Sequence, residues 1–223
     1  MSRGDPFTET GLLAAGLGLA YGAFALTFRG PPPRFWQRMT RTGLALGSLA
    51  ALTDPDLRRP RVGVRDVALG LGSAAGLYAI FQAGDRLARK VLPSGGQEIG
   101  DIYALQHLRP RAELVARLGL VIGPAEELFW RGFVQRRLAR RVGRWPAAAL
   151  ASGSYGGAHI VTTNLTLTGA ASVAGAYWST LAALGAPMSA LIVSHVAWDI
   201  WIFLVAPTQA PPSDEVSRMG PGL

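Results

Sequence analysis

The sequence predicts an all-α protein, a polytopic transmembrane helical bundle of about six to eight helices. Three observations support this prediction. Of the 223 residues, 49% are hydrophobic and only 16% are charged, whereas soluble domains carry about 25% charged residues. Long apolar runs recur along the chain, separated by short segments rich in arginine or proline. The 28 glycines also fit, because membrane helices contain glycine more often than soluble helices do.

The charge balance bears on the partners of the protein. The net charge of +8 comes from arginine, since Lys90 is the only lysine. A nucleic-acid binder can carry such an excess. Here the arginines cluster between apolar runs instead, which predicts contact with membrane lipids that have anionic head groups, and no nucleic-acid partner. The absence of cysteine excludes disulfides and thiolate metal ligands.

Residues 1–100 are predicted to contain N-terminal membrane spans and basic loops. The first span ends before Pro31, because three successive prolines cannot continue a helix. Residues 35–42 form a basic, aromatic segment suited to the membrane interface, and residues 53–66 form an arginine-rich loop. Three apolar runs are expected to span the membrane: residues 11–28, a short run at 43–52, and residues 67–84, where small side chains allow close helix approach. The run at 43–52 spans only if the interfacial residues before it are drawn in, and is otherwise re-entrant.

Residues 101–206 are predicted to form a core of helices, and residues 207–223 a disordered tail. A loop at residues 93–100 and a short amphipathic piece at residues 101–108 precede this core. Helical periodicity resumes at Arg111 and continues to about residue 141. Three further helices are expected at residues 146–161, 169–185 and 188–205.

Charged side chains interrupt one of these apolar helices. Glu126, Glu127 and Arg131 lie within it, although each charge in a bilayer costs ~2.5–3.5 kcal/mol on insertion scales. Glu127 and Arg131 are four residues apart and share a helix face, so an ion pair explains Glu127. Glu126 points about 100° round the helix and has no local partner. Glu126 is therefore the acid that we predict to act in chemistry.

Two of the three histidines also lie in apolar helices. His159 follows Tyr155 by four residues, and His195 precedes Asp199 by four, so each pair shares a helix face. If the basic cluster at residues 136–144 marks one membrane surface, a rise of ~1.5 Å per residue places Glu126 and both histidines ~12–21 Å from that surface. This depth allows them to converge on one site. A single buried histidine more often forms a hydrogen bond between helices than it takes part in catalysis. Tyr155 is expected to be a packing residue.

Such a set of residues can activate water. Desolvation and a nearby arginine act in opposite directions on the ionisation of a buried carboxylate, and their balance suits Glu126 to act as a general base. One histidine can share the proton of the water, and the other can donate a hydrogen bond to an oxyanion. The alternative is metal-assisted hydrolysis, with Glu126, His159 and His195 as ligands of a divalent metal such as zinc.

The ordered motifs Glu126-Glu127-x-x-x-Arg131, Tyr155-x-x-x-His159 and His195-x-x-x-Asp199 resemble the CAAX protease and bacteriocin-processing (CPBP) family. These intramembrane endopeptidases are related to the type II CAAX prenyl endopeptidase, and the resemblance covers about residues 100–205. It implies that Glu126 and His159 activate the water and that His195 and Asp199 line the oxyanion side. It also implies that Glu127 and Arg131 order the site.

Two residues depart from the commonest pattern of that family. Tyr155 stands where phenylalanine is usual, which adds a hydroxyl, and Asp199 stands where the CAAX-processing enzymes have asparagine. An ionised aspartate cannot donate to an oxyanion. Asp199 is therefore expected to be protonated, to orient His195, or to bind a metal.

The sequence thus predicts a glutamate-type, intramembrane CAAX-like endopeptidase. By resemblance, the substrate is a membrane-associated peptide or protein and the location is a bacterial plasma membrane, with several membrane passes. Two rival interpretations are a non-catalytic immunity or scaffold protein of the same fold and a proton-coupled transporter. The intact acids, arginine and histidines argue against the first rival, and the absence of a sequence repeat argues against the second.

Overall fold

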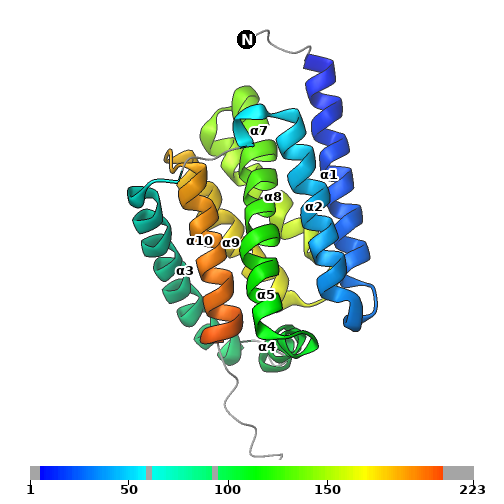
Figure 1. Ribbon diagram of the computed structural model, residues 1–223, viewed down its shortest axis with the longest axis vertical. Helices are drawn as coiled ribbons and strands as arrows, with labels where there is room; N and C mark the ends of the chain where they lie inside the picture. Colours follow the sequence, from blue (N-terminus) through cyan, green and yellow to red (C-terminus); the bar gives the residue numbers. More distant parts are fainter. Residues whose placement is uncertain (1–5, 59–61, 92–94, 208–223) are drawn as a thin grey trace, which may run out of the picture.

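A computed structural model describes residues 6–58, 62–91 and 95–207, and these residues form a bundle of helices without strands (Figure 1). If the segments between Arg111 and Val142 are counted as one continuous helix, the described residues contain eight helices. The predicted all-α helical bundle is confirmed. The predicted disordered tail, apart from its first residue, lies outside the described residues.

The helices are numbered as in Figure 1. The N-terminal part contains α1 (Pro6–Phe28), α2 (Phe35–Thr53), α3 (Val64–Val91) and α4 (Gly95–Ala104). The C-terminal part contains α5 (Arg111–Arg117), α6 (Gly123–Glu127), α7 (Arg136–Val142), α8 (Arg144–Ala158), α9 (Leu165–Ala183) and α10 (Met188–Ile200). Short 3-10 turns lie at Pro32–Arg34, Pro55–Leu57, Leu105–Leu108 and Ile160–Thr162. Three π-helical segments lie at Leu118–Ile122, Leu128–Gln135 and Trp201–Val205.

Helices α5, α6 and α7 are one continuous element, because π-helical turns join them instead of loops. The turns Leu118–Ile122 and Leu128–Gln135 lie on either side of α6, which carries Glu126 and Glu127. Such turns are rare and frequently occur at functional sites. The helix predicted to begin at Arg111 is therefore confirmed, with a widened backbone on both sides of the two acids.

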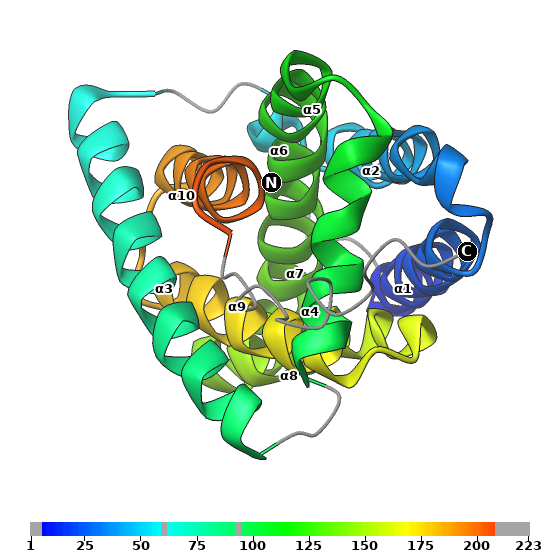
Figure 2. The same ribbon diagram turned by 90° about the horizontal axis from the view of Figure 1, so that it is seen from below.

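This continuous element lies near the centre of the bundle. Viewed from its end, α10 and α3 lie on one side of it, α2 and α1 on the other, and α8 and α9 along a third side (Figure 2). Phe129, Trp130 and Phe133 are completely buried. The central position explains how the two acids of α6 reach the interior of the molecule.

Three helical segments among the described residues are long and apolar enough to cross a membrane: Phe7–Phe28, Val64–Arg86 and Met188–Val205. Each presents large apolar side chains on its outer surface, and Leu26, for example, is 74% exposed. A patch of this kind is unfavourable in water and suits contact with lipid tails. The fold therefore supports a membrane location.

Two predicted segments differ from the structure. We expected an interfacial segment before a short span at residues 43–52, but α2 is a single helix of 19 residues. Arg38 permits this, because its guanidinium donates to the carbonyl oxygens of Thr27 (3.1 Å) and Pro31 (2.7 Å). The loop predicted at residues 93–100 is also wrong over its described part, since α4 begins at Gly95.

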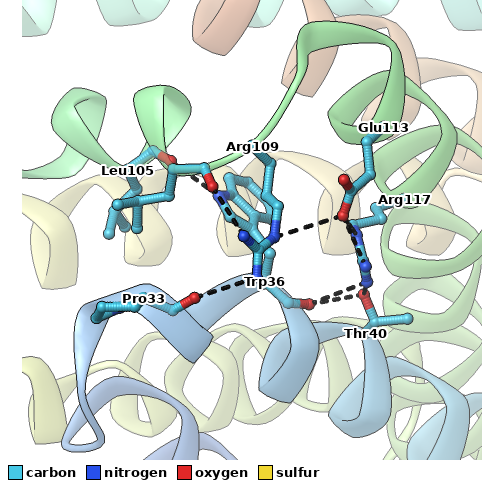
Figure 3. A network of polar contacts seen from close by, with 8 residues as sticks. Pro33, Trp36, Thr40, Leu105, Arg109, Glu113 and Arg117 are labelled. Carbon is cyan, nitrogen blue, oxygen red and sulfur yellow. Dashed lines mark hydrogen bonds and ion pairs between the residues drawn. The ribbon is translucent and has the colours of Figure 1, made fainter.

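A polar network connects α2 to the chain that follows α4 (Figure 3). The indole nitrogen of Trp36 donates to the carbonyl oxygen of Leu105 at 2.8 Å. Arg117 donates to the hydroxyl of Thr40 at 2.6 Å and to Glu113 at 2.8 Å. These bonds hold the turn after α4 against the start of α2, at the lower end of the bundle in Figure 1.

Gly70 allows α3 to lie directly against α10. A Cβ atom at Gly70 would come within 2.6 Å of Val193 and within 2.8 Å of the carbonyl oxygen of Ala190, whereas a Cβ atom at Gly72 would meet open space. We therefore expect Gly70→Ala to lower the free energy of unfolding by about 1–3 kcal/mol. Gly72→Ala is the matched control and should leave it unchanged or higher. Thermal unfolding in detergent measures both, and equal melting temperatures for the two variants would contradict this packing.

Candidate active site

A cavity of about 470 Å³ lies inside the bundle, and its lining comes from α1, α2, α3, α4, α8, α9, α10 and the continuous α5–α7 element. Most of its lining is apolar. Five residues of the predicted acid and histidine motifs, from three separate elements, also face it: Glu126, Tyr155, His159, His195 and Asp199. The sequence predicted that Glu126, His159 and His195 could converge on one site, and in the structure all three face this cavity.

Glu126 is buried in α6 and has a partner on another helix. Its Oε2 atom accepts a hydrogen bond of 2.8 Å from the hydroxyl of Tyr155 in α8. The Tyr155 ring also packs edge-on against Trp130, with ring centroids 5.4 Å apart. The expectation that Tyr155 only packs is therefore incomplete. The sequence signal for this contact was a hydroxyl group in an apolar helix, four residues before a histidine.

His159 lies at the C-terminal end of α8. Its Nδ1 atom is 2.9 Å from the carbonyl oxygen of Tyr155. Because a carbonyl oxygen only accepts hydrogen bonds, Nδ1 carries the proton and Nε2 carries the lone pair of a neutral imidazole. The rings of Phe24 and Phe28 lie 5.1 and 5.6 Å from the imidazole. His159 is thus a fixed proton acceptor in an apolar setting.

Glu127 is completely buried, and a single oxygen of its carboxylate connects two elements. This Oε1 atom lies 2.9 Å from the guanidinium of Arg131, as the four-residue spacing predicted. It also lies 2.6 Å from Nδ1 of His195 in α10. Glu127 therefore does more than the sequence indicated, because it holds the second histidine as well as the arginine.

Arg131 connects three elements of the site. Besides its ion pair with Glu127, it donates to the carbonyl oxygen of Gly175 in α9 at 3.2 Å. Its guanidinium also lies 5.1 Å from the ring centre of Tyr155 and 5.3 Å from that of Trp178. These contacts fix α6, α8 and α9 relative to one another.

His195 is held at both edges and on one face. Its Nε2 atom is 3.6 Å from Oδ2 of Asp199, one turn further along α10. Its ring stacks on the indole of Trp178, with centroids 4.0 Å apart and planes inclined by 16°. Trp178 is fixed in turn, since its indole nitrogen donates to the hydroxyl of Ser194 at 3.0 Å. The sequence predicted Trp178 as a packing residue but did not reveal its position against His195.

A metal ion at this site would need several histidine or carboxylate ligands. Within the part of the chain that the structure describes, no group of three or more histidine, cysteine, aspartate or glutamate side chains is placed to hold a metal ion. The possible zinc ligands Glu126, His159 and His195 form no such group, although the contact of Nδ1 with a protein oxygen leaves Nε2 of each histidine as the atom that could bind a metal.

Comparison with known proteins adds one finding. Residues 110–201 match the family model described as Type II CAAX prenyl endopeptidase Rce1-like. The matched range contains all the predicted site residues: Glu126, Glu127, Arg131, His159, His195 and Asp199. The resemblance predicted from the three motifs is confirmed over this part of the chain, and the match supports protease activity at a membrane. No curated protein and no solved structure gives a significant match.

Proposed function

We propose that this protein is an integral membrane endopeptidase that hydrolyses peptide bonds with a water molecule activated by Glu126 and His159. The observation that supports this most directly is the convergence of an acid and two histidines on one cavity. The walls of this cavity are largely apolar, and a low local dielectric strengthens the electrostatic interactions of the groups that face it.

Glu126 is the proposed general base. The hydroxyl of Tyr155 occupies its Oε2 atom, which leaves Oε1 to accept a proton from water. The lone pair on Nε2 of His159 accepts the second hydrogen bond of that water and orients it. The oxygen of the water then bonds to the carbonyl carbon, and the electron pair of the C=O double bond moves to the carbonyl oxygen. When this intermediate collapses, the C–N bond breaks and the proton on Glu126 passes to the leaving amine.

His195 is proposed to stabilise the oxyanion as an imidazolium that donates through Nε2, and its neighbours are positioning residues. Its bond to Glu127 and its stacking on Trp178 fix the plane of the imidazole. Asp199 lies beside Nε2 and orients the ring, since an ionised carboxylate cannot donate to an oxyanion. Arg131 holds Glu127 in place, so its effect on the reaction is indirect.

The proposed substrate is a membrane-anchored or prenylated peptide, in a bacterial plasma membrane. Its test is cleavage of such peptides by the full chain purified in detergent. We expect the wild type to cleave them, and Glu126→Ala and His159→Ala to lose most of the activity. If both variants cleave as fast as the wild type, the proposed mechanism is wrong.

The same assay tests the role of metal. Because no group of three histidine, aspartate or glutamate side chains among the described residues is placed to hold a metal ion, we propose that the reaction needs no metal. The expected result is an unchanged cleavage rate after dialysis against a chelator. A rate that falls with chelation and returns on addition of zinc would instead favour the metal-assisted alternative.

A further inference from the structure

The hydroxyl of Tyr155 is a buried hydrogen-bond donor at the reacting end of the cavity. It lies 2.8 Å from Glu126, and Tyr155 is only 6% exposed. We propose that Tyr155 is a catalytic residue that donates first to the carboxylate of Glu126 and then to the oxyanion. This inference rests on the proposed function, because it concerns the step in which Glu126 takes a proton from water.

Few of the motif side chains at this end of the cavity can donate a hydrogen bond. Glu126 and Asp199 only accept hydrogen bonds when ionised. The ring proton of His159 is directed to the carbonyl oxygen of Tyr155, so its other nitrogen accepts. Of the five motif residues that face the cavity, Tyr155 and, as an imidazolium, His195 are therefore the two that can donate to an oxyanion. A hydroxyl donor complements an imidazole because it adds a hydrogen bond without adding a charge.

The position of the negative charge changes during the reaction. Before proton transfer, the charge is on Glu126. After Glu126 has taken the proton of the water, Glu126 is neutral and the charge is on the carbonyl oxygen of the substrate. Hydrogen bonds to an ionised acceptor are roughly twice as strong as those to a neutral one. The best acceptor for the Tyr155 hydroxyl is therefore Glu126 at first and the oxyanion afterwards.

This exchange needs only a small motion. The proton of Tyr155 stays on its oxygen throughout, and the hydroxyl rotates about the bond between that oxygen and the ring. The ring itself is confined by Trp130 at 5.4 Å and by the guanidinium of Arg131 at 5.1 Å, both measured to its centre. Gly175 lets α9 lie close to it, since a Cβ atom there would come within 2.9 Å of the ring. The donor is thus preorganised.

The first measurement is the activity of Tyr155→Phe, which removes a single oxygen atom. We expect kcat to fall on the order of 100-fold, as for loss of an oxyanion donor. KM should stay nearly unchanged, because the new bond forms only in the transition state. Tyr21→Phe is the matched control. Tyr21 also donates to the backbone of α8, at Ser154, but lies outside the cavity lining, so its rate should equal that of the wild type.

The second measurement separates donation to the oxyanion from simple orientation of Glu126. A phosphonate peptide, which carries a tetrahedral anion, is bound to Glu126→Gln and to the double variant Glu126→Gln/Tyr155→Phe. The neutral amide stands in for protonated Glu126 and is a weaker acceptor than the charged phosphonate, so Tyr155 is expected to donate to the phosphonate. We expect the double variant to bind it about 10- to 100-fold more weakly, with equal affinity for the uncleaved peptide.

Two results overturn the proposal. One is a Tyr155→Phe variant with the kcat of the wild type. The other is equal phosphonate affinity of the two Glu126→Gln proteins, which would limit Tyr155 to orienting Glu126. Neither result would contradict the proposed function. That function would be contradicted if Glu126→Ala and His159→Ala retained full cleavage. Melting temperatures of all variants show whether each protein is folded.

Discussion

Replacing Arg131 with methionine will lower the free energy of unfolding by about 3–5 kcal/mol, the usual cost of removing one partner from a buried ion pair. Arg131 is 3% exposed, and its guanidinium neutralises Glu127, which is completely buried. Methionine fills a similar volume but leaves that charge with His195 as its remaining partner. Chemical or thermal unfolding in detergent measures the loss.

Two matched variants give this prediction its control. Arg136→Met makes the same change in the same continuous helix, but Arg136 is 43% exposed, so water reaches its ion pair with the buried Asp54. Removing this partly solvated arginine should therefore lower the free energy of unfolding clearly less than removing Arg131. The double variant Glu127→Gln/Arg131→Met removes both charges and should recover much of the lost stability. If Arg131→Met and Arg136→Met unfold alike, the buried pair is not important for stability.

Glu126→Gln will lower kcat by about 10²–10⁴-fold while leaving the protein folded. The amide has almost the shape of the carboxylate, and its oxygen can still accept the hydrogen bond from Tyr155. It cannot take a proton from water at neutral pH, so the chemical step is lost while substrate binding remains. Cleavage kinetics and a binding assay with uncleaved peptide separate these two effects.

Glu113→Gln is the control for this substitution. Glu113 lies in the same continuous helix and is partly exposed, and it pairs with Arg109 and Arg117 outside the cavity lining. We expect it to change kcat by less than about twofold, since exposed ion pairs contribute little. A similar loss in both variants would mean that any change of charge in this helix disturbs the enzyme, and the role of Glu126 as a base would be refuted.

The parts of the fold that the sequence predicted well depend on local chemistry. Apolar runs of sufficient length and the prolines after Phe28 determine where α1 and α10 begin or end. The four-residue spacing places Glu127 and Arg131 on one helix face, whatever the tertiary structure. The position of His195 two turns into α10 follows in the same way from the chain, because the helix begins directly after Pro187.

The remaining features depend on contacts between residues far apart in the sequence. Helix α4 forms where glycines predicted a loop, and the Glu98 carboxylate anchors it by accepting from the backbone nitrogen of Thr166 at the start of α9. The bond from Tyr155 to Glu126 joins residues separated by 29 positions, and no helical periodicity encodes it. The π-helical turns around α6 were also unexpected, since one sequence gives no signal for a widened register.

Arg131 and His195 bind the same oxygen atom of Glu127, so substitutions at these two positions are expected to influence each other. The two side chains come from different helices, yet the strength of each bond depends on the charge that the other leaves on that oxygen. Their substitutions will therefore show epistasis, so that the effect of a change at one position depends on the residue at the other. A variant library that alters residues 131 and 195 together contains combinations whose fitness neither single variant predicts.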